Sequence, residues 1–208
     1  LMAIVGGSKV STKLPLLENL LTKVDVLVIG GAMANTFLKA RGDNVGDSLY
    51  EPDWIETAKA LMDKGREILL PIDATVAKNL EDPAGIRTCL IPDIQQDDKI
   101  FDMGPLSCER ILETMKTCHT LLWNGPVGVF EIPPFDQGTT TLAHLVGDLT
   151  QKGSLLSVAG GGDTVAALAH ANAMDDFTYV STAGGAFLEW LEGKTLAGVE
   201  AMGEHNAN

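Results

Sequence analysis

The stretch Ala-Ile-Val-Gly-Gly-Ser-Lys at residues 3–9 decides the fold, because a short apolar run ends there in two glycines and a polar segment follows. The same form recurs as Val-Leu-Val-Ile-Gly-Gly at residues 26–31 and as Leu-Leu-Ser-Val-Ala-Gly-Gly-Gly at residues 155–162. Apolar runs without polar alternation are typical of strands that are buried on both faces of a sheet. These segments therefore predict parallel strands, each followed by a glycine turn.

Helical segments separate the apolar runs. Leucine and other apolar residues recur at helical spacing around residues 14–21, 55–62 and 142–149. Strands that alternate with helices require right-handed crossovers and form a doubly wound sheet. The sequence therefore predicts an α/β fold with a six-stranded parallel sheet, Rossmann-like, in a three-layer α/β/α arrangement. The strand candidates are residues 3–5, 26–29, 68–70, 120–123, 155–158 and 178–181.

The regular alternation breaks between Pro71 and Pro105, where the chain becomes polar. We expect a small strand pair there, around residues 73–77 and 86–91, and assign it no function. No internal repeat or linker is visible, which predicts one domain over residues 1–202 and a polar tail at 203–208. Because Leu1 already lies in an apolar run, we expect the natural protein to continue upstream.

Composition excludes several classes of function. The 208 residues carry a formal net charge of −13, which argues against a nucleic-acid partner because phosphate neutralisation needs a basic face. No apolar run has the length of a membrane span, and no signal peptide is readable. The three cysteines have no C-x-x-C spacing, so we expect a reducing cytoplasm and buried or inert thiols. The four scattered histidines are interpreted as structural or solvated.

Four of the strand candidates end in small-residue turns. In open parallel sheets, ligands bind beyond the carboxyl ends of the strands, and glycine lets the backbone approach them. The N-terminus of the following helix favours a phosphate group. Neither the G-x-x-x-x-G-K-[ST] loop nor a G-x-G-x-x-G fingerprint is present. The sequence thus predicts a phosphate-bearing ligand on a rim formed by Gly6-Gly7-Ser8-Lys9, Gly30-Gly31-Ala32, Gly160-Gly161-Gly162-Asp163-Thr164 and Ala183-Gly184-Gly185-Ala186.

Charged residues lie in two of these turns. Lys9 and Lys13 are one helical turn apart. If the first helix begins between Ser8 and Ser11, both ammonium groups can reach phosphates at its start. The alternative interpretation is that both lysines are solvated. Asp163 follows three glycines at a helix start, which suits Mg²⁺ held by one carboxylate plus nucleotide phosphates, or a simple N-cap.

The segment Trp-Asn-Gly-Pro-Val-Gly-Val-Phe-Glu at residues 123–131 follows the fourth strand candidate. A base-binding wall is one interpretation, with Val129 packed on a purine and Glu131 accepting hydrogen bonds from ribose hydroxyls. The other is a rigid loop. Trp123 and Phe130 we assign to packing.

Taken together, these segments resemble the phosphoglycerate kinase family, and the match runs from residue 1 to about 202. The resemblance rests on five motifs in order, at residues 6–13, 30–34, 123–131, 160–164 and 181–186. It implies a six-stranded parallel sheet. It also implies reversible phosphoryl transfer from 1,3-bisphosphoglycerate to ADP, which gives ATP and 3-phosphoglycerate in glycolysis.

Carried over to this chain, the resemblance implies a role for each matching residue. Lys9 stabilises the phosphoryl group in flight, and the backbone N–H groups of Gly184 and Gly185 assist it. Lys13 contacts the nucleotide phosphates, and Asp163 is the Mg²⁺ ligand. The other implied nucleotide-binding residues are Gly7, Gly31, Leu49, Pro126 and Val129 at adenine, Glu131 at ribose, and Asn124, Gly161, Gly162 and Thr164 near the phosphates.

The sequence departs from the family pattern in three respects. Ala32 and Ala183 replace glycines, with little expected effect, whereas the negative charge of Asp47 is expected to weaken nucleotide affinity modestly. The family's N-terminal domain, which holds phosphoglycerate, is absent from this chain. We therefore expect this chain to be the C-terminal, nucleotide-binding half, a cytoplasmic monomer that binds Mg-ADP or Mg-ATP. We expect it to meet 1,3-bisphosphoglycerate or 3-phosphoglycerate only together with the missing domain, and to be inactive alone.

Two alternatives remain at this point. One is a naturally truncated, non-catalytic nucleotide-binding module. The genomic reading frame upstream of Leu1 would distinguish natural truncation from a fragment cut by an experimenter. The other is a dehydrogenase domain that binds NAD. It requires an acidic residue at the end of the second strand, where Ile29-Gly30-Gly31 stands instead.

Overall fold

The main feature of the chain is a six-stranded parallel sheet with strand order β3-β2-β1-β7-β8-β9. The computed structural model describes residues 1–81, 85–183, 187, 189 and 191–193. The predicted α/β, doubly wound sheet is confirmed. Its strands are β1 (Met2–Val5), β2 (Val26–Ile29), β3 (Glu67–Leu69), β7 (Thr120–Asn124), β8 (Leu156–Gly160) and β9 (Tyr179–Ser181).

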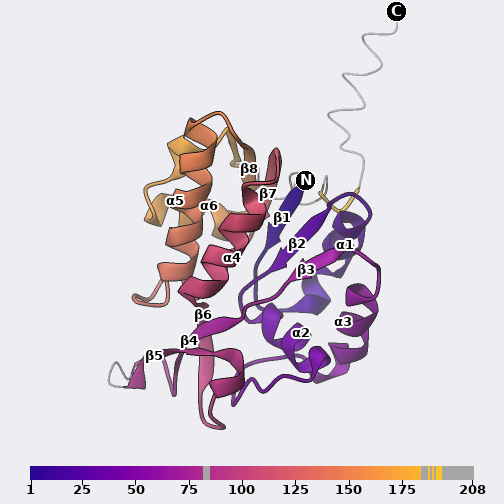
Figure 1. The fold of residues 1–208 in the computed structure, drawn as a ribbon, viewed down its shortest axis with the longest axis vertical. Helices are drawn as coiled ribbons and strands as arrows, with labels where there is room; N and C mark the ends of the chain where they lie inside the picture. The colour runs from indigo at the N-terminus through magenta and orange to yellow at the C-terminus, as the bar shows by residue number, and fades with distance from the viewer. Residues whose placement is uncertain (82–84, 184–186, 188, 190, 194–208) are drawn as a thin grey trace, which may run out of the picture.

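Helices cover both faces of this sheet. Figure 1 shows α1, α2 and α3 on one face and α4, α5 and α6 on the other. In the described part of the chain, no helix combines the length and apolar character needed to cross a membrane. The helices are α1 (Val10–Leu21), α2 (Met33–Arg41), α3 (Ile55–Met62), α4 (Pro105–Met115), α5 (Gln137–Gln151) and α6 (Gly162–His170).

The strands are apolar throughout because each of their two sides faces a different helix layer. In β1, Ala3 and Val5 pack in the cluster formed with α1 and α2, whereas Met2 and Ile4 pack in the cluster formed with α4 and α5. All four side chains are at most 1% exposed. The uninterrupted apolar pattern is therefore the direct consequence of two-sided burial.

A second, antiparallel sheet occupies the polar stretch between Pro71 and Pro105. It has three strands in the order β5-β4-β6: β4 (Asp73–Ala77), β5 (Arg87–Leu90) and β6 (Lys99–Met103). The predicted strand pair was therefore incomplete, because the polar run at residues 95–98 obscured the strand that follows it. Single-turn 3₁₀ helices also occur: η1 (Pro52–Trp54), η3 (Ile91–Asp93) and η4 (Met174–Asp176).

The topology of the main sheet has its switch point between β1 and β7. The chain adds strands outward from β1 through β2 to β3, and it then returns to pair β7 with the other side of β1. Strand order reverses at this point, and ligands in open α/β sheets bind beyond the carboxyl ends of the strands at such a reversal. The turns that follow β1 and β7 meet there.

Candidate functional site

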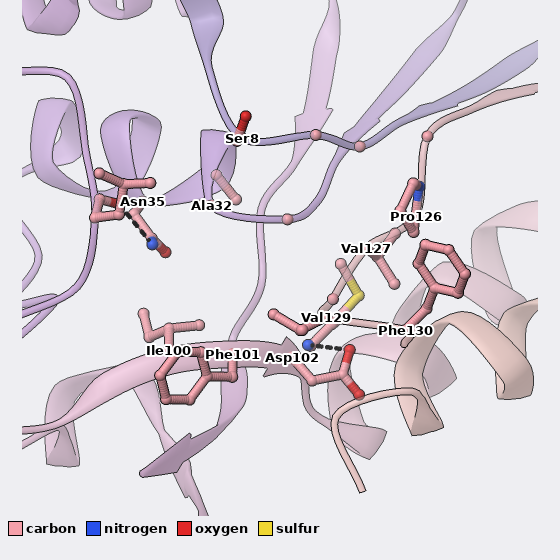
Figure 2. Close-up of a pocket in the computed structure, with 18 of the residues that line it drawn as sticks. Ser8, Ala32, Asn35, Ile100, Phe101, Asp102, Pro126, Val127, Val129 and Phe130 are labelled. Carbon is pink, nitrogen blue, oxygen red and sulfur yellow. Dashed lines mark hydrogen bonds between the residues drawn. The ribbon is translucent and has the colours of Figure 1, made fainter. Parts of the chain in front are cut away.

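A cavity of about 820 Å³ opens at this carboxyl edge of the main sheet. The turns after β1, β2, β7 and β8 contribute to it, and the first half of α2 and strand β6 form further walls (Figure 2). Residues that the sequence marked as separate candidates thus share one cavity. Those in its lining are Gly7, Lys13, Gly31, Leu49, Asn124, Pro126, Val129, Glu131, Gly161, Gly162, Asp163 and Thr164.

Backbone hydrogen bonds lock the glycine turns together. The Gly6 N–H donates to the Asn124 carbonyl at 2.9 Å, and the Gly31 N–H donates to the Val127 carbonyl at 3.0 Å. Gly31 has a φ of +68°, and a Cβ there would lie 2.5 Å from the Gly7 carbonyl oxygen. Glycine is required at this position by both the backbone angle and the close approach.

Lys13 points into the cavity and is held there by Asn124. The Lys13 Nζ donates to Asn124 Oδ1 at 2.5 Å, while Asn124 Nδ2 donates to the Gly160 carbonyl at 2.8 Å. Burial lowers the Lys13 pKa to about 8, and the negative charge of Asp163 opposes that shift. Asn124 is only 3% exposed, so one buried amide joins the lysine of the first helix to the end of β8. The result is a fixed, partly desolvated cation.

The start of α6 supplies an acidic group to the cavity, Asp163. Gly161 precedes the helix with a φ of +101°, and exposed Asp163 lies in the first turn. Thr164 Oγ1 accepts a hydrogen bond from the Gly125 N–H at 2.7 Å, which fixes this helix start to the turn after β7. Within the described ranges, no cluster of three or more His, Cys, Asp or Glu residues could hold a metal ion. A single carboxylate fits Mg²⁺ that takes its other ligands from phosphate and water.

Three predicted catalytic residues differ from the rest in their placement. Lys9 is the exposed N-cap residue of α1 and is not part of the cavity lining, although it lies one turn from Lys13. Gly184 and Gly185 lie outside the described residues.

Strand β6 forms a wall of the cavity that the sequence did not reveal. Ile100, Phe101 and Asp102 all line it, opposite the turn at residues 126–129 (Figure 2). The Val129 N–H donates to the Phe101 carbonyl at 2.9 Å, which joins the two walls. The signal that could have indicated this strand is the short run at residues 99–103 followed by Gly104 and Pro105.

Asp102 is a buried carboxyl group in this wall. Its two oxygens accept hydrogen bonds from the Met103 N–H at 2.8 Å and the Gly138 N–H at 2.7 Å. Burial raises the pKa of Asp102 to about 8, and the nearby charge of Asp136 adds to the shift. The backbone of Gly128 packs so closely that a Cβ there would lie 1.9 Å from Asp102 Oδ1. This side chain thus supports the loop that carries Val129.

The loop with Asp47 and Leu49 completes the cavity. The Asp47 N–H donates to the Asp98 carbonyl at 2.8 Å, and the Ile100 N–H donates to Ser48 Oγ at 2.8 Å. Lys99 Nζ lies 3.3 Å from Asp47 Oδ2, so a cation accompanies the negative charge that the sequence placed near the pocket. The small sheet therefore has a structural role in the site.

The aromatic residues of the segment at 123–131 are buried. Trp123 is 1% exposed, and its Nε1 donates to the Gly125 carbonyl at 2.8 Å, which confirms its assignment to packing. Phe130 is 8% exposed and also lines the cavity. Its interpretation as a packing residue is therefore confirmed but incomplete.

Fold and site together define a doubly wound α/β domain with a glycine-lined, lysine-bearing cavity at the switch point of its parallel sheet. The family model described as phosphoglycerate kinase matches residues 1–194, and the chain belongs to the phosphoglycerate kinase family. Membership in this family removes the NAD-dependent dehydrogenase alternative.

Individual relatives agree with this assignment. The phosphoglycerate kinase of Rhodopseudomonas palustris is 57% identical over 205 residues, which cover 97% of this chain and 52% of that protein. The corresponding enzyme of Novosphingobium aromaticivorans is 54% identical over 205 residues, covering 96% and 52%. The structure of phosphoglycerate kinase from Coxiella burnetii matches with a TM-score of 0.90 and 46% identity, covering 98% of this chain and 52% of that one. The chain thus spans about half the length of the relatives it matches.

Proposed function

We propose that this chain is the nucleotide-binding, C-terminal half of a phosphoglycerate kinase, over residues 1–202. The observation that carries the proposal is the convergence of glycine turns, Lys13 and Asp163 on one cavity at the sheet's switch point. Mg-ADP or Mg-ATP suits such a cavity because it combines a phosphate chain with an apolar base. In the whole enzyme, this half would serve the transfer of a phosphoryl group from 1,3-bisphosphoglycerate to ADP in cytoplasmic glycolysis.

Lys13 is the residue that we assign to the nucleotide phosphates. Its ammonium group is already positioned by Asn124 and is partly stripped of water. A phosphate oxygen therefore meets a cation that needs little reorganisation, which is the basis of electrostatic stabilisation in phosphoryl transfer. Glycines at positions 7, 161 and 162 allow the phosphates to approach the backbone.

Asp163 is the residue that we assign to Mg²⁺. When bound, Mg²⁺ would supply charge neutralisation on the phosphate oxygens. The exposed carboxylate at the first turn of α6 faces the same cavity as Lys13. Pro126 and Val129 are assigned to the base together with Leu49, and Glu131 is assigned to the ribose. Lys9, Gly184 and Gly185 are assigned to the phosphoryl group in transfer.

We further propose that the isolated chain is inactive. Phosphoryl transfer depends on positioning and on exclusion of water, and we assign the phosphoglycerate seat to the half of the enzyme that lies outside these 208 residues. With Mg-ADP and 1,3-bisphosphoglycerate, we expect the purified chain to form no ATP above the uncatalysed background. Enzymatic turnover by the chain alone would contradict this statement.

Thermal unfolding tests the binding part of the proposal. At 100 times the dissociation constant, a ligand that binds only the folded state stabilises it by about 2.7 kcal/mol. Mg-ADP should therefore raise the unfolding midpoint of the wild-type chain, and Asp163→Ala should reduce that rise. Asp148→Ala, an exposed carboxylate on α5 that does not line the cavity, is the matched control. An equal rise in wild type and Asp163→Ala would contradict the assigned Mg²⁺ ligand.

A further inference from the structure

Helix α1, which carries Lys13 into the cavity, begins without a cap from its own first residues. Its N-cap residue is Lys9, which makes no side-chain cap hydrogen bond, and its first turn contains no acidic side chain. The start of a helix leaves four N–H groups without a partner inside the helix, and these groups need acceptors from elsewhere. The position of the α1 start is therefore not set by local sequence alone.

Glu51, 40 residues further along the chain than Ser11, supplies an acceptor to this helix start. Glu51 Oε2 accepts a hydrogen bond from the Ser11 N–H at 3.0 Å, and Glu51 Oε1 accepts one from the Ser11 hydroxyl. Ser11 follows Val10, the first residue of α1. A carboxylate at a helix N-terminus forms charge-assisted hydrogen bonds and is favoured by the helix dipole. Glu51 thus caps α1 from a separate loop.

The loop that carries Glu51 is itself fastened to helix α2. The Glu51 N–H donates to Thr36 Oγ1 at 3.1 Å, and Asn35 Nδ2 donates to the Leu49 carbonyl at 2.9 Å. Thr36 is fully buried, and Asn35 is 1% exposed. Neither bond involves the carboxylate of Glu51. A change of that carboxylate therefore removes the contact with α1 and leaves these two anchors of the loop in place.

Glu51 acts on the cavity only through α1. Lys13 lines the cavity, whereas Glu51 does not. The Lys13 Nζ donates to Asn124 Oδ1 at 2.5 Å, so the far end of this side chain is held by β7. Its backbone end belongs to the helix turn that Glu51 caps through Ser11. The lysine is thus fixed at both ends, and Glu51 accounts for one of them.

We propose that Glu51 is a positioning residue for the nucleotide phosphates, because its carboxylate fixes the start of α1 and thereby the place of the Lys13 ammonium group in the cavity. The proposal rests on the nucleotide-binding function proposed above. Simple repulsion between Glu51 and phosphate makes the opposite prediction, since removal of the negative charge would then tighten binding. The sign of the change in affinity separates the two effects.

Glu51→Gln tests this sign by calorimetric titration of Mg-ADP. Glutamine has nearly the same size but no charge, and its single amide oxygen cannot serve both donors of Ser11 as a carboxylate does. We expect the dissociation constant to rise by about 5-fold, because loss of a helix cap reduces the population of the capped, binding-competent helix start by about this factor. An unchanged or lower dissociation constant would overturn the proposal.

Glu18→Gln is the matched control. Glu18 is an exposed residue of the same helix, lies 3.5 Å from Lys64 Nζ, and does not line the cavity. The substitution changes the net charge of the chain by the same amount as Glu51→Gln. We expect it to leave the dissociation constant of Mg-ADP unchanged. A rise equal to that of Glu51→Gln would show an effect of charge alone and would overturn the proposal.

A double-mutant cycle with Lys13→Ala separates positioning of the lysine from general support of the fold. Circular dichroism establishes that all four proteins of the cycle are folded. If Glu51 acts through Lys13, Glu51→Gln should weaken Mg-ADP binding by less than about 2-fold once the lysine has been removed. An equal loss of affinity with and without Lys13 would show that Glu51 only supports the fold, and this outcome would overturn the proposal.

Ser11→Ala approaches the same contact from its other side and serves if Glu51→Gln does not fold. It removes the hydroxyl bond but keeps the carboxylate and the backbone bond, so we expect a smaller loss of affinity in the same direction; no loss would overturn the proposal. If the folded wild-type chain does not bind Mg-ADP, the proposed function itself fails. Wild-type binding that Glu51→Gln leaves intact overturns only the role of Glu51.

Discussion

Replacing Asp102 by asparagine should remove a pH dependence of stability that the buried carboxyl group creates. The pKa of Asp102 is raised from 3.8 to about 8 in the folded chain, with burial as the main cause. Between these two values the folded state holds a proton that the unfolded state has released. Stability linked to this group is therefore present at low pH and is lost as the pH rises toward 8.

The expected magnitude follows from this difference of one proton. Each pH unit between the two pKa values changes the free energy of unfolding by about 1.4 kcal/mol, so the step from about pH 5 to about pH 7 lowers it by roughly 3 kcal/mol. Other groups with shifted pKa values titrate outside this pH interval. The pKa values of Asp25, Asp97 and Asp136 are lowered from 3.8, and that of Lys13 falls from 10.5 to about 8.

Urea unfolding, followed by circular dichroism at several pH values across this interval, provides the assay. The wild-type free energy of unfolding should decline with rising pH, and the Asp102→Asn profile should be flatter by about 1.4 kcal/mol per unit. Asp53→Asn makes the same chemical change at an exposed position and should keep the wild-type slope. Parallel profiles for wild type and Asp102→Asn would refute the assignment of a protonated, buried Asp102.

Two further predictions concern the walls of the cavity. In Gly6→Ala the added Cβ would lie 1.8 Å from the Pro126 carbonyl oxygen, so the free energy of unfolding in urea should fall by about 1–3 kcal/mol. Gly162→Ala, with nothing within 4 Å of its Cβ and no positive φ, should change it by less than about 1 kcal/mol; equal effects would contradict this steric explanation. Asp47→Lys should tighten Mg-ADP binding by at most about 5-fold, because Lys99 already accompanies the Asp47 charge; an unchanged dissociation constant would remove any role for that charge.

The fold was predictable because two-sided burial leaves a plain pattern in the sequence. The predicted strand at residues 26–29 agrees with β2 to the residue, and the apolar residues at helical spacing over 55–62 lie in α3. Helix α1 begins at Val10, within the interval where the sequence placed its start. All three elements have regular periodicity, and α1 begins and β2 ends next to a glycine turn, so local chemistry sets these boundaries.

From local pattern alone, the site was predictable mainly next to the glycine turns, whereas the assignment of Leu49 came from the family resemblance. Lys13, Asn124 and Asp163 lie next to such turns, and the structure brings them into one cavity. The contributions of Phe101 and Asn35 come from the far wall, which depends on long-range packing of β6 and α2 against the turns. A half-buried strand within a polar stretch and a buried amide on an ordinary helix leave no comparable local signal.

Lys13 provides the most direct test of the central claim that this cavity binds a nucleotide through its phosphates. Mg-ADP should be titrated calorimetrically into the wild-type chain and into Lys13→Ala, with circular dichroism to establish that both are folded. We expect saturable binding by wild type that weakens by about 10-fold or more in the variant, because a charge-assisted hydrogen bond to phosphate is lost. Absence of saturable binding by the folded wild-type chain, or equal affinity of the two proteins, would contradict it.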